Sequence, residues 1–380
     1  MIDVLVVGGG PAGSVAATVL ARAGVRVCIV DRSAFPRDKL CGDTVNPGTL
    51  ALLRRLRMAS GIDACGLPVA GMRVTGERGV AVEARYKEGI AGRALLRRHL
   101  DWMLLQDAIA AGAQFEPSLT VRRALVEKDR VTGVQASGHP FEGELRAPVT
   151  IAADGRHSTL AFGLGLAWHP PRPRRWAIGA YVESGAVTSP PLDLGEMHVR
   201  ADRYVGIAPV PGGLTNVCLV KPWQPGDPAL GDPRTTLAQE LSRDAALRER
   251  FAGARLAGAP VVLGPLAVDV SDVAFDGLLL AGDAAGFIDP MTGDGLRFAV
   301  RGAELAAHAA LQALEHGWSG VHHRLRARRR AEFAAKWRFN RLVRTLVASP
   351  GAVAGASWGA RLAPAALHAA IEYAGDVGRA

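Results

Sequence analysis

The sequence predicts a doubly wound α/β domain, with an antiparallel β-sheet domain inserted into it and a helical region at the C-terminus. Three observations support this fold class. Short apolar runs lead directly into glycine-containing segments at 8–13, 154–158 and 281–295, as at the ends of buried parallel strands. Between 159 and 265 the sequence changes to runs in which apolar and polar residues alternate, and the sequence after 321 is predicted to be helical. At 380 residues, 49% of them hydrophobic, the chain can form two domains.

The first glycine segment opens a predicted nucleotide-binding unit. The apolar run Val4–Val7 is a predicted strand, after which the glycines turn the chain into a helix. Gly8 permits the sharp turn, Gly10 lets the backbone approach a pyrophosphate, and Gly13 lets the helix pack closely on the strand. The next apolar run ends at Asp31, an acid placed to accept hydrogen bonds from ribose hydroxyls. The alternative is a structural glycine turn that binds nothing.

The second segment follows another apolar run, 149–153. Asp154 is an acid able to orient ribose hydroxyls or backbone amides, and Gly155 leaves room beside it. Taken alone, an Asp-Gly pair is only a turn signal. Its place after a predicted strand, and after a matching first segment, gives it more weight.

The third segment repeats the pattern once more. Gly282 and Asp283 end the apolar run 278–280, and a long alanine-rich helix is predicted to begin near residue 294 and run toward 314. The N-terminus of such a helix carries a partial positive charge that favours a bound anion. This segment is the longest and most specific of the three.

These three segments, in this order, resemble the FAD-binding oxidoreductases that include aromatic hydroxylases, flavin-dependent halogenases and geranylgeranyl reductases. The resemblance covers most of the chain. It implies a Rossmann-like FAD-binding domain, FAD as cofactor and NAD(P)H as electron donor. The residues that it implies at the cofactor are Gly8, Gly10, Pro11, Ala12, Gly13, Asp31, Arg32, Arg37, Cys41, Gly42, Arg97, Asp154, Gly155, Gly282, Asp283, Pro290, Gly293, Asp294, Gly295 and Leu296.

The stretch 35–43 is similar to one that geranylgeranyl reductases carry beside the flavin ring. The resemblance places Arg37 near the phosphates or ribityl chain of FAD, and makes Cys41 the one candidate catalytic residue. The alternative for Cys41 is an ordinary buried thiol. Arg97 matches a family arginine that helps to hold the dinucleotide, and its alternative is a charge on the surface of a helix.

The strand 204–209 is expected to line the substrate pocket. Geranylgeranyl reductases tend to show Tyr-x-Trp-x-Phe-Pro there, and tryptophan halogenases show Trp-x-Trp-x-Ile-Pro. This chain keeps Tyr204 and Pro209 but has Gly206 and Ala208 between them. Halogenation therefore loses its main sequence support, and prenyl reduction is weakened, since smaller side chains would reshape the pocket.

The predicted domains are discontinuous in sequence. The FAD-binding domain is predicted to comprise 1–71, 93–160 and 266–320, the substrate domain 72–92 and 161–265, and the C-terminal helical region 321–380.

The net charge of +9 arises almost entirely from one segment, since 321–350 holds nine basic residues against Glu332. No nucleic-acid-binding motif accompanies it, so no nucleic-acid partner is expected. Phe333 and Trp337 share one helical face, and Leu342 and Leu346 lie on another. Apolar residues on two faces suggest a partner, a lipophilic substrate or peripheral contact with a membrane. The alternative is that the arginines lie on a solvated face.

The four cysteines show no metal-ligand spacing, so no metal site is expected and the thiols suit a reducing cytoplasm. The ten histidines suggest no triad, and no protein acid or base is assigned. In the expected mechanism, the reduced flavin either activates O2 or passes hydride to a substrate double bond.

The favoured reaction is monooxygenation of an aromatic or polyketide-like lipophilic metabolite of secondary metabolism. The alternative is saturation of prenyl or other C=C bonds by a geranylgeranyl reductase-like enzyme, which the 35–43 stretch supports. Halogenation, and a redox-silent FAD-binding protein, are further alternatives.

Overall fold

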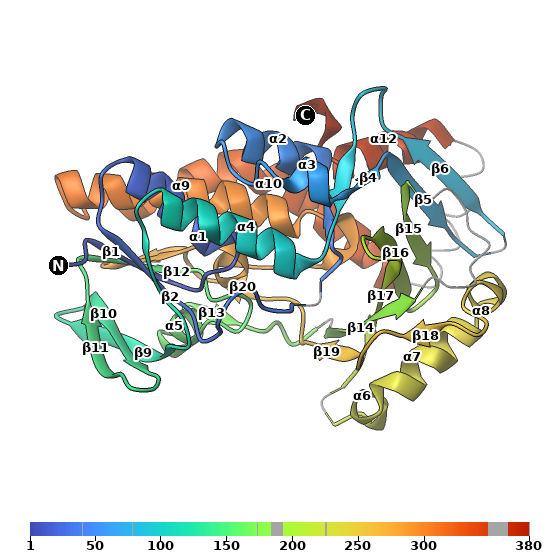
Figure 1. Ribbon diagram of the computed structural model, residues 1–380, viewed down its shortest axis with the longest axis horizontal. Helices are drawn as coiled ribbons and strands as arrows, with labels where there is room; N and C mark the ends of the chain where they lie inside the picture. The colour runs from blue at the N-terminus through green and yellow to red at the C-terminus, as the bar shows by residue number, and fades with distance from the viewer. Residues whose placement is uncertain are drawn as a thin grey trace.

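The computed structural model describes residues 1–39, 41–77, 79–172, 174–183, 193–224, 226–348 and 364–379. Two large sheets organise this part of the chain. Figure 1 shows a parallel sheet under a layer of long helices on one side and a second sheet with its own helices on the other. This arrangement confirms the predicted fold class.

The first sheet has six strands, and its middle strands run parallel. In spatial order they are β21 (Ala274–Phe275), β22 (Leu278–Leu280), β12 (Val149–Ala152), β1 (Val4–Val7), β2 (Val27–Val30) and β8 (Gln114–Glu116). Every residue of β1, β2, β12 and β22 is buried, as their continuous apolar sequences predict. The three glycine segments follow β1, β12 and β22, so they meet at one edge of the sheet.

Three helices cover one face of this sheet: α1 (Pro11–Arg22), α4 (Arg97–Ala110) and α9 (Gly295–His316). The helix α1 packs against both α4 and α9, which is why most of its residues are buried. A small antiparallel sheet of β9 (Thr120–Glu127), β10 (Arg130–Ser137) and β11 (Glu142–Arg146) lies beyond the opposite face (Figure 1), where β10 packs against β12. Beside it lies the short helix α5 (Thr159–Gly163).

The central strands of the second sheet come from the region 159–265, where the sequence shows alternating runs. Its order is β18 (Arg255–Leu256), β14 (Arg175–Glu183), β17 (Leu214–Pro222), β16 (Tyr204–Val210), β15 (Leu194–Val199), β5 (Gly71–Thr75) and β6 (Ala81–Arg85), and β19 (Val261–Leu263) also pairs with β14. The pairs are antiparallel with one exception, β15 and β5, which run parallel. The expectation of a purely antiparallel sheet is corrected there, because β5 comes from a distant part of the chain and adds to the edge in the same direction.

Small helices cover the outer face of the second sheet. These are α6 (Pro228–Gly231), α7 (Pro233–Ser242) and α8 (Ala245–Arg250). Leu237, Leu241 and Leu247 of α7 and α8 form a core with Ile178 and Val217. The other face of the sheet is turned toward the loop that precedes α9, where Phe287 and Met291 pack on it.

Shorter elements join the two sheets. They are β3 (Thr44–Val45), β4 (Leu67–Val69) and β7 (Gly92–Ala94) in one small sheet, β13 (Ala167–Trp168) and β20 (Asp269–Val270) in another, and the helices α2 (Pro47–Arg55) and α3 (Ile62–Cys65).

The C-terminal region is built of α10 (Val321–Ala348), α12 (Pro364–Ala374) and the short η3 (Val377–Arg379). Phe333 is fully buried and Trp337 packs on the same core, because α10 lies along α9. The solvated-face alternative is right for much of the arginine but wrong for Arg329, which is only 3% exposed. Residues 349–363 of the predicted C-terminal helical region lie outside the described residues. None of the helices that the structure describes is long and apolar enough to cross a membrane.

Candidate active site

The first glycine segment forms a tight turn whose shape excludes side chains. Gly8 has a φ of 103°, and a Cβ there would lie 2.5 Å from the Ala153 carbonyl oxygen. A Cβ on Gly13 would lie 1.8 Å from the Gly8 carbonyl oxygen. A Cβ on Gly10 would meet, among the described residues, only the Arg37 guanidinium, at 3.3 Å. The turn is therefore closed toward the sheet and open at Gly10, where α1 begins with Pro11 and Ala12 and its first N–H groups favour an anion.

Asp31 holds this turn from the end of β2. Its carboxylate accepts hydrogen bonds from the Gly9 amide at 2.7 Å and the Ser33 amide at 2.8 Å. Each oxygen keeps a further lone pair for a ligand hydroxyl. Arg32, the next predicted cofactor residue, is exposed.

Two arginines, Arg37 and Arg97, lie beside the turn around the carboxylate of Asp101. Arg97 is 5% exposed and makes a bidentate pair with Asp101, at 2.7 and 3.0 Å. The Arg37 guanidinium lies 3.3 Å from the same carboxylate. Burial works against the charge of Arg97, but Asp101 and Cys41 beside it raise its pKa overall. The alternative of a surface helix charge is therefore wrong for Arg97.

Lys39 is a member of this cluster that the sequence reasoning missed. Burial lowers its pKa, the positive charge of Arg97 adds to that effect, and Asp283 opposes it. A Cβ on Gly155 would lie 4.0 Å from the Lys39 ammonium. Lys39 thus lies between the second and third glycine segments. The sequence did carry one signal for Lys39, which is its position two residues from both Arg37 and Cys41.

The second and third segments complete the edge of the sheet. One Asp154 oxygen accepts from the Thr159 amide at 2.8 Å, and the other is shielded from solvent with no partner among the described residues. Burial raises the pKa of Asp154. Gly282 has a φ of 61°, and a Cβ there would lie 2.8 Å from the Ala12 Cβ, so the third segment packs on α1.

In the loop after the third segment, the predicted cofactor residues lie in different surroundings. It passes through a short helix, η2 (Pro290–Thr292), and Gly293 in a left-handed conformation before α9 begins at Gly295. Asp294 is 1% exposed and accepts a hydrogen bond from Lys336 of α10 at 3.1 Å. Its carboxylate is thus turned toward the C-terminal helices, and Leu296 joins the hydrophobic core.

Cys41 is half-buried between this edge and the second sheet. Its backbone carbonyl accepts a hydrogen bond from the Asn216 amide of β17 at 2.8 Å. Its thiol lies beside the Arg97 guanidinium. A Cβ on Gly42 would meet, among the described residues, only the Thr44 hydroxyl, at 4.0 Å. The geometry thus brings Cys41 and Arg97 together at the junction of the two sheets.

A family model described as "FAD binding domain" matches residues 1–337. The chain belongs to this family. It is 32% identical to the menaquinone reductase of Mycolicibacterium smegmatis, over 80% of this chain and 75% of that protein. It is 33% identical to digeranylgeranylglycerophospholipid reductase 2 of Methanopyrus kandleri, over 82% of this chain and 78% of that protein. Its fold is similar to that of the flavin-dependent brominase Bmp2, with a TM-score of 0.83 and 19% identity, over 98% of this chain and 93% of that one.

The site residues fit FAD. The open side at Gly10 and the uncapped start of α1 suit a pyrophosphate, and Arg37 and Lys39 add positive charge there. Asp31 and the unpartnered oxygen of Asp154 remain available to ribose or ribityl hydroxyls. Among the described residues, no three His, Cys, Asp or Glu side chains gather as a metal ion would require.

One residue of the predicted substrate strand, Tyr204, contacts the loop that precedes α9. Tyr204 is 2% exposed and donates to Asp289 at 2.5 Å, and Arg175 lies 3.9 Å from the same carboxylate. Tyr204 therefore joins the sheet to the loop before α9. Gly206 faces the Met197 side chain, Ala208 is buried, and Pro209 is half-buried next to it.

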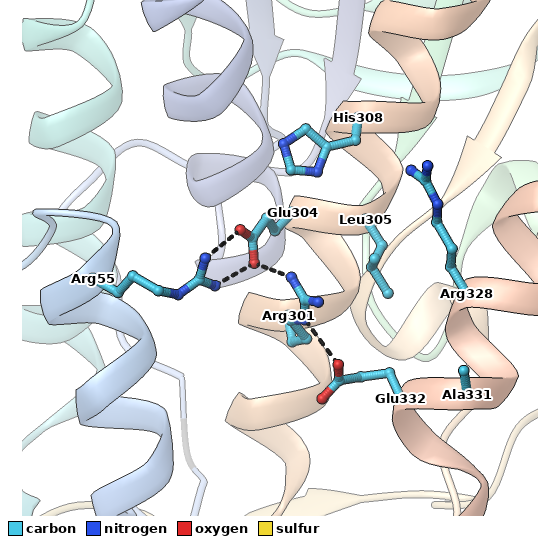
Figure 2. Close-up of a pocket in the computed structure, with 8 residues that line it drawn as sticks. All are labelled: Arg55, Arg301, Glu304, Leu305, His308, Arg328, Ala331 and Glu332. Carbon is cyan, nitrogen blue, oxygen red and sulfur yellow. Dashed lines mark hydrogen bonds and ion pairs between the residues drawn. The ribbon is translucent and has the colours of Figure 1, made fainter. Parts of the chain in front are cut away.

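A pocket of about 550 Å³ lies elsewhere, on the outer side of α9 between α2 and α10. Figure 2 shows Arg55 and Arg301 pointing toward Glu304, and Arg301 also reaching Glu332. These acids and bases neutralise one another, and no glycine segment contributes to the lining. The FAD site is therefore not this pocket.

Proposed function

We propose that this protein is an FAD-dependent reductase that saturates C=C bonds of an isoprenoid-type lipophilic substrate, with NAD(P)H as the electron donor. The observation that carries the proposal is the position of Cys41. It lies beside Arg97, between the second sheet and the edge of the parallel sheet where the three glycine segments meet. The names of the two reductase relatives, each about one third identical, support the same reaction class.

Binding of the cofactor is assigned to groups at the sheet edge. The glycine turn and Asp31 would hold the adenosine half, and Arg37 and Lys39 would supply positive charge to its phosphates. When bound, FAD supplies hydride equivalents. Reduction of a C=C bond requires a hydride at one carbon and a proton at the other. The Cys41 thiol is the proposed proton donor, because the Arg97 guanidinium would stabilise the thiolate left behind.

The substrate surface is the face of the second sheet turned toward Cys41. The strand register aligns Gly206 with Cys218 on β17 and with Met197 on β15. Small and flexible apolar side chains at this position would let the surface adapt to an extended hydrocarbon, which needs few polar contacts. The replacement of bulky residues at Gly206 and Ala208 thus reshapes the surface and remains compatible with a reductase. Together with the names of the relatives, this leads us to favour the reductase over the monooxygenase that the sequence analysis preferred.

The lipophilic substrate leads to a second proposal, about where it is met. Leu342 and Leu346 at the end of α10 are 59% and 36% exposed, next to the exposed Arg338 and Arg341. Exposed leucines among arginines suit the surface of an anionic membrane. We propose peripheral binding through this end of α10.

The test follows the flavin absorbance. The FAD-loaded protein is reduced without oxygen and mixed with a menaquinone or with a geranylgeranyl lipid. We expect rapid return of oxidised flavin with one of these acceptors, and a slow return in air. Rapid reoxidation by air only in the presence of an aromatic substrate would instead support a monooxygenase. Cys41→Ser should bind FAD normally but lose most of the acceptor-dependent rate.

A further inference from the structure

Asp43 occupies an unusual position two residues after Cys41. It is 1% exposed and has a φ of 51°, in the left-handed region that non-glycine residues rarely adopt. Such a conformation persists where the surrounding structure holds it in place. The hydrogen bonds of Asp43 show what holds it.

The carboxylate of Asp43 connects three elements. One oxygen accepts from the Arg97 backbone amide at 3.2 Å, at the first turn of α4. The other accepts from the Tyr181 hydroxyl of β14 and the Asn216 amide of β17, both at 2.7 Å. The backbone carbonyl of Asp43 accepts from the Leu95 amide at 2.9 Å. The start of a helix in one domain and two neighbouring strands in the other thus meet at one side chain.

Asn216 links this bridge to Cys41. Its amide nitrogen donates both to the Asp43 carboxylate and to the Cys41 carbonyl oxygen, at 2.8 Å. Asn216 is itself only 1% exposed and pairs with Tyr181 across the strands. A change at Asp43 is therefore passed to the backbone of Cys41 through a single side chain.

The charged and titratable groups around Asp43 come from every element packed against it. They are Arg97 on α4, Tyr181 on β14, Cys218 on β17 and Cys41 on its own segment. Burial raises the pKa of Asp43 to about 6, while Tyr181, Arg97 and Asn216 oppose that shift. The ionised Asp43 is thus held by two neutral donors, by the N-terminus of α4 and by the charge of Arg97, whose guanidinium is paired with Asp101.

We infer that Asp43 is a positioning residue: its ionised carboxylate, through Tyr181 and Asn216, fixes the Cys41 segment against the second sheet. The inference rests on the proposed function in so far as Cys41 serves the reaction. The geometry of the segment can be measured without any substrate. If alkene reduction fails but Cys41 is positioned as described, only the proposed function is overturned.

The test measures the alkylation rate of Cys41 by iodoacetamide in the FAD-loaded protein, followed on the Cys41 peptide by mass spectrometry. Asp43→Asn removes the charge and places an NH2 group against either the Arg97 backbone amide or the Tyr181 and Asn216 donors, so the segment should open. We expect Cys41 to react about tenfold faster than in the wild type near pH 8, as loss of a buried hydrogen bond would allow. Below about pH 5 the two rates should converge, because the wild-type carboxyl is then protonated as well.

The comparison of rates at each pH cancels the effect of pH on the thiol itself. Asp38→Asn, in the same stretch but with a side chain 79% exposed, is the matched control and should leave the rate unchanged. Tyr181→Phe removes one donor with little change in packing, and should give a smaller increase if Asp43→Asn does not fold. Equal rates in wild type, Asp43→Asn and Tyr181→Phe near pH 8 would overturn the inference. A rate ratio that does not change with pH would overturn it too.

Discussion

Lys336, in the middle of the basic helix α10, donates to the Asp294 carboxylate at the start of α9 at 3.1 Å. Both side chains are buried. The same ammonium donates to the backbone carbonyl of Ala374 at 3.2 Å and to that of Tyr373. The helix that begins at the cofactor loop is thus anchored to the C-terminal region.

Lys336→Met should destabilise the protein by about 3–5 kcal/mol, because it leaves the Asp294 carboxylate buried without its cation. Burial already raises the pKa of Asp294, and the loss of Lys336 raises it further. The loss of stability should therefore be larger at neutral than at acid pH, where the carboxyl is protonated. Urea unfolding at both pH values measures this. Arg338→Met, at an exposed position of α10, is the control, and an equal effect of the two changes would contradict the account.

Gly13→Ala should abolish FAD binding, because the new Cβ would lie 1.8 Å from the Gly8 carbonyl oxygen and force the glycine turn apart. The ratio of flavin to protein absorbance after purification measures the effect. Gly163→Ala at the end of α5 is the matched control, since a Cβ there meets no described atom within 4 Å. A Gly13→Ala protein that is purified with a full complement of bound FAD would show that this turn is not where the cofactor binds.

The buried Asp43 predicts a specific dependence of stability on pH. Its pKa is about 6 in the folded protein against 3.8 for an ordinary carboxyl, so the folded state binds the proton more tightly. The resulting stability is complete below about pH 4 and is lost as the pH rises through about 6, an effect on the order of 3 kcal/mol. Unfolding free energies measured across this range should show the loss in wild type, and Asp43→Asn should flatten the profile. Identical pH profiles for the two proteins would refute the assignment.

The exposed end of α10 predicts binding to anionic vesicles. Flotation with vesicles of mixed phosphatidylglycerol and phosphatidylcholine should recover the protein. Vesicles of phosphatidylcholine alone should recover much less, because each arginine near an anionic surface contributes about 1 kcal/mol to the binding free energy. The double change Arg338→Glu and Arg341→Glu should abolish recovery. Recovery that does not depend on vesicle charge would argue against this surface.

The parts of the fold that could be predicted are those that local sequence determines. Val4–Val7 reads as a buried strand, and Gly8 and Gly13 are required by the turn that follows, so both the strand and the FAD edge could be placed. The parallel pairing of β5 with β15 could not, because it depends on which distant segment reaches the sheet edge.

The site was harder to predict where its contacts join the two large sheets. Asp43 and Asn216 are 173 residues apart, and no local pattern joins them. One signal was present: Asn216 is a polar residue in the mostly apolar strand β17, on the face opposite the hydrophobic core formed with the outer helices. Lys336 gave a weaker signal, as the one lysine in a helix whose other basic residues are arginines.

The central claim is that the bound flavin reduces a C=C bond, and the most direct measurement is the mass of the product. The reduced protein is incubated with a geranylgeranyl lipid or menaquinone in heavy water, without oxygen, and the lipid is analysed by mass spectrometry. We expect a product that carries two non-exchangeable deuterium atoms, because both the reduced flavin N–H and the Cys41 thiol exchange with heavy water, and most of this gain should be lost with Cys41→Ser. Product that forms only with O2, and that carries oxygen from isotopically heavy O2, would contradict it.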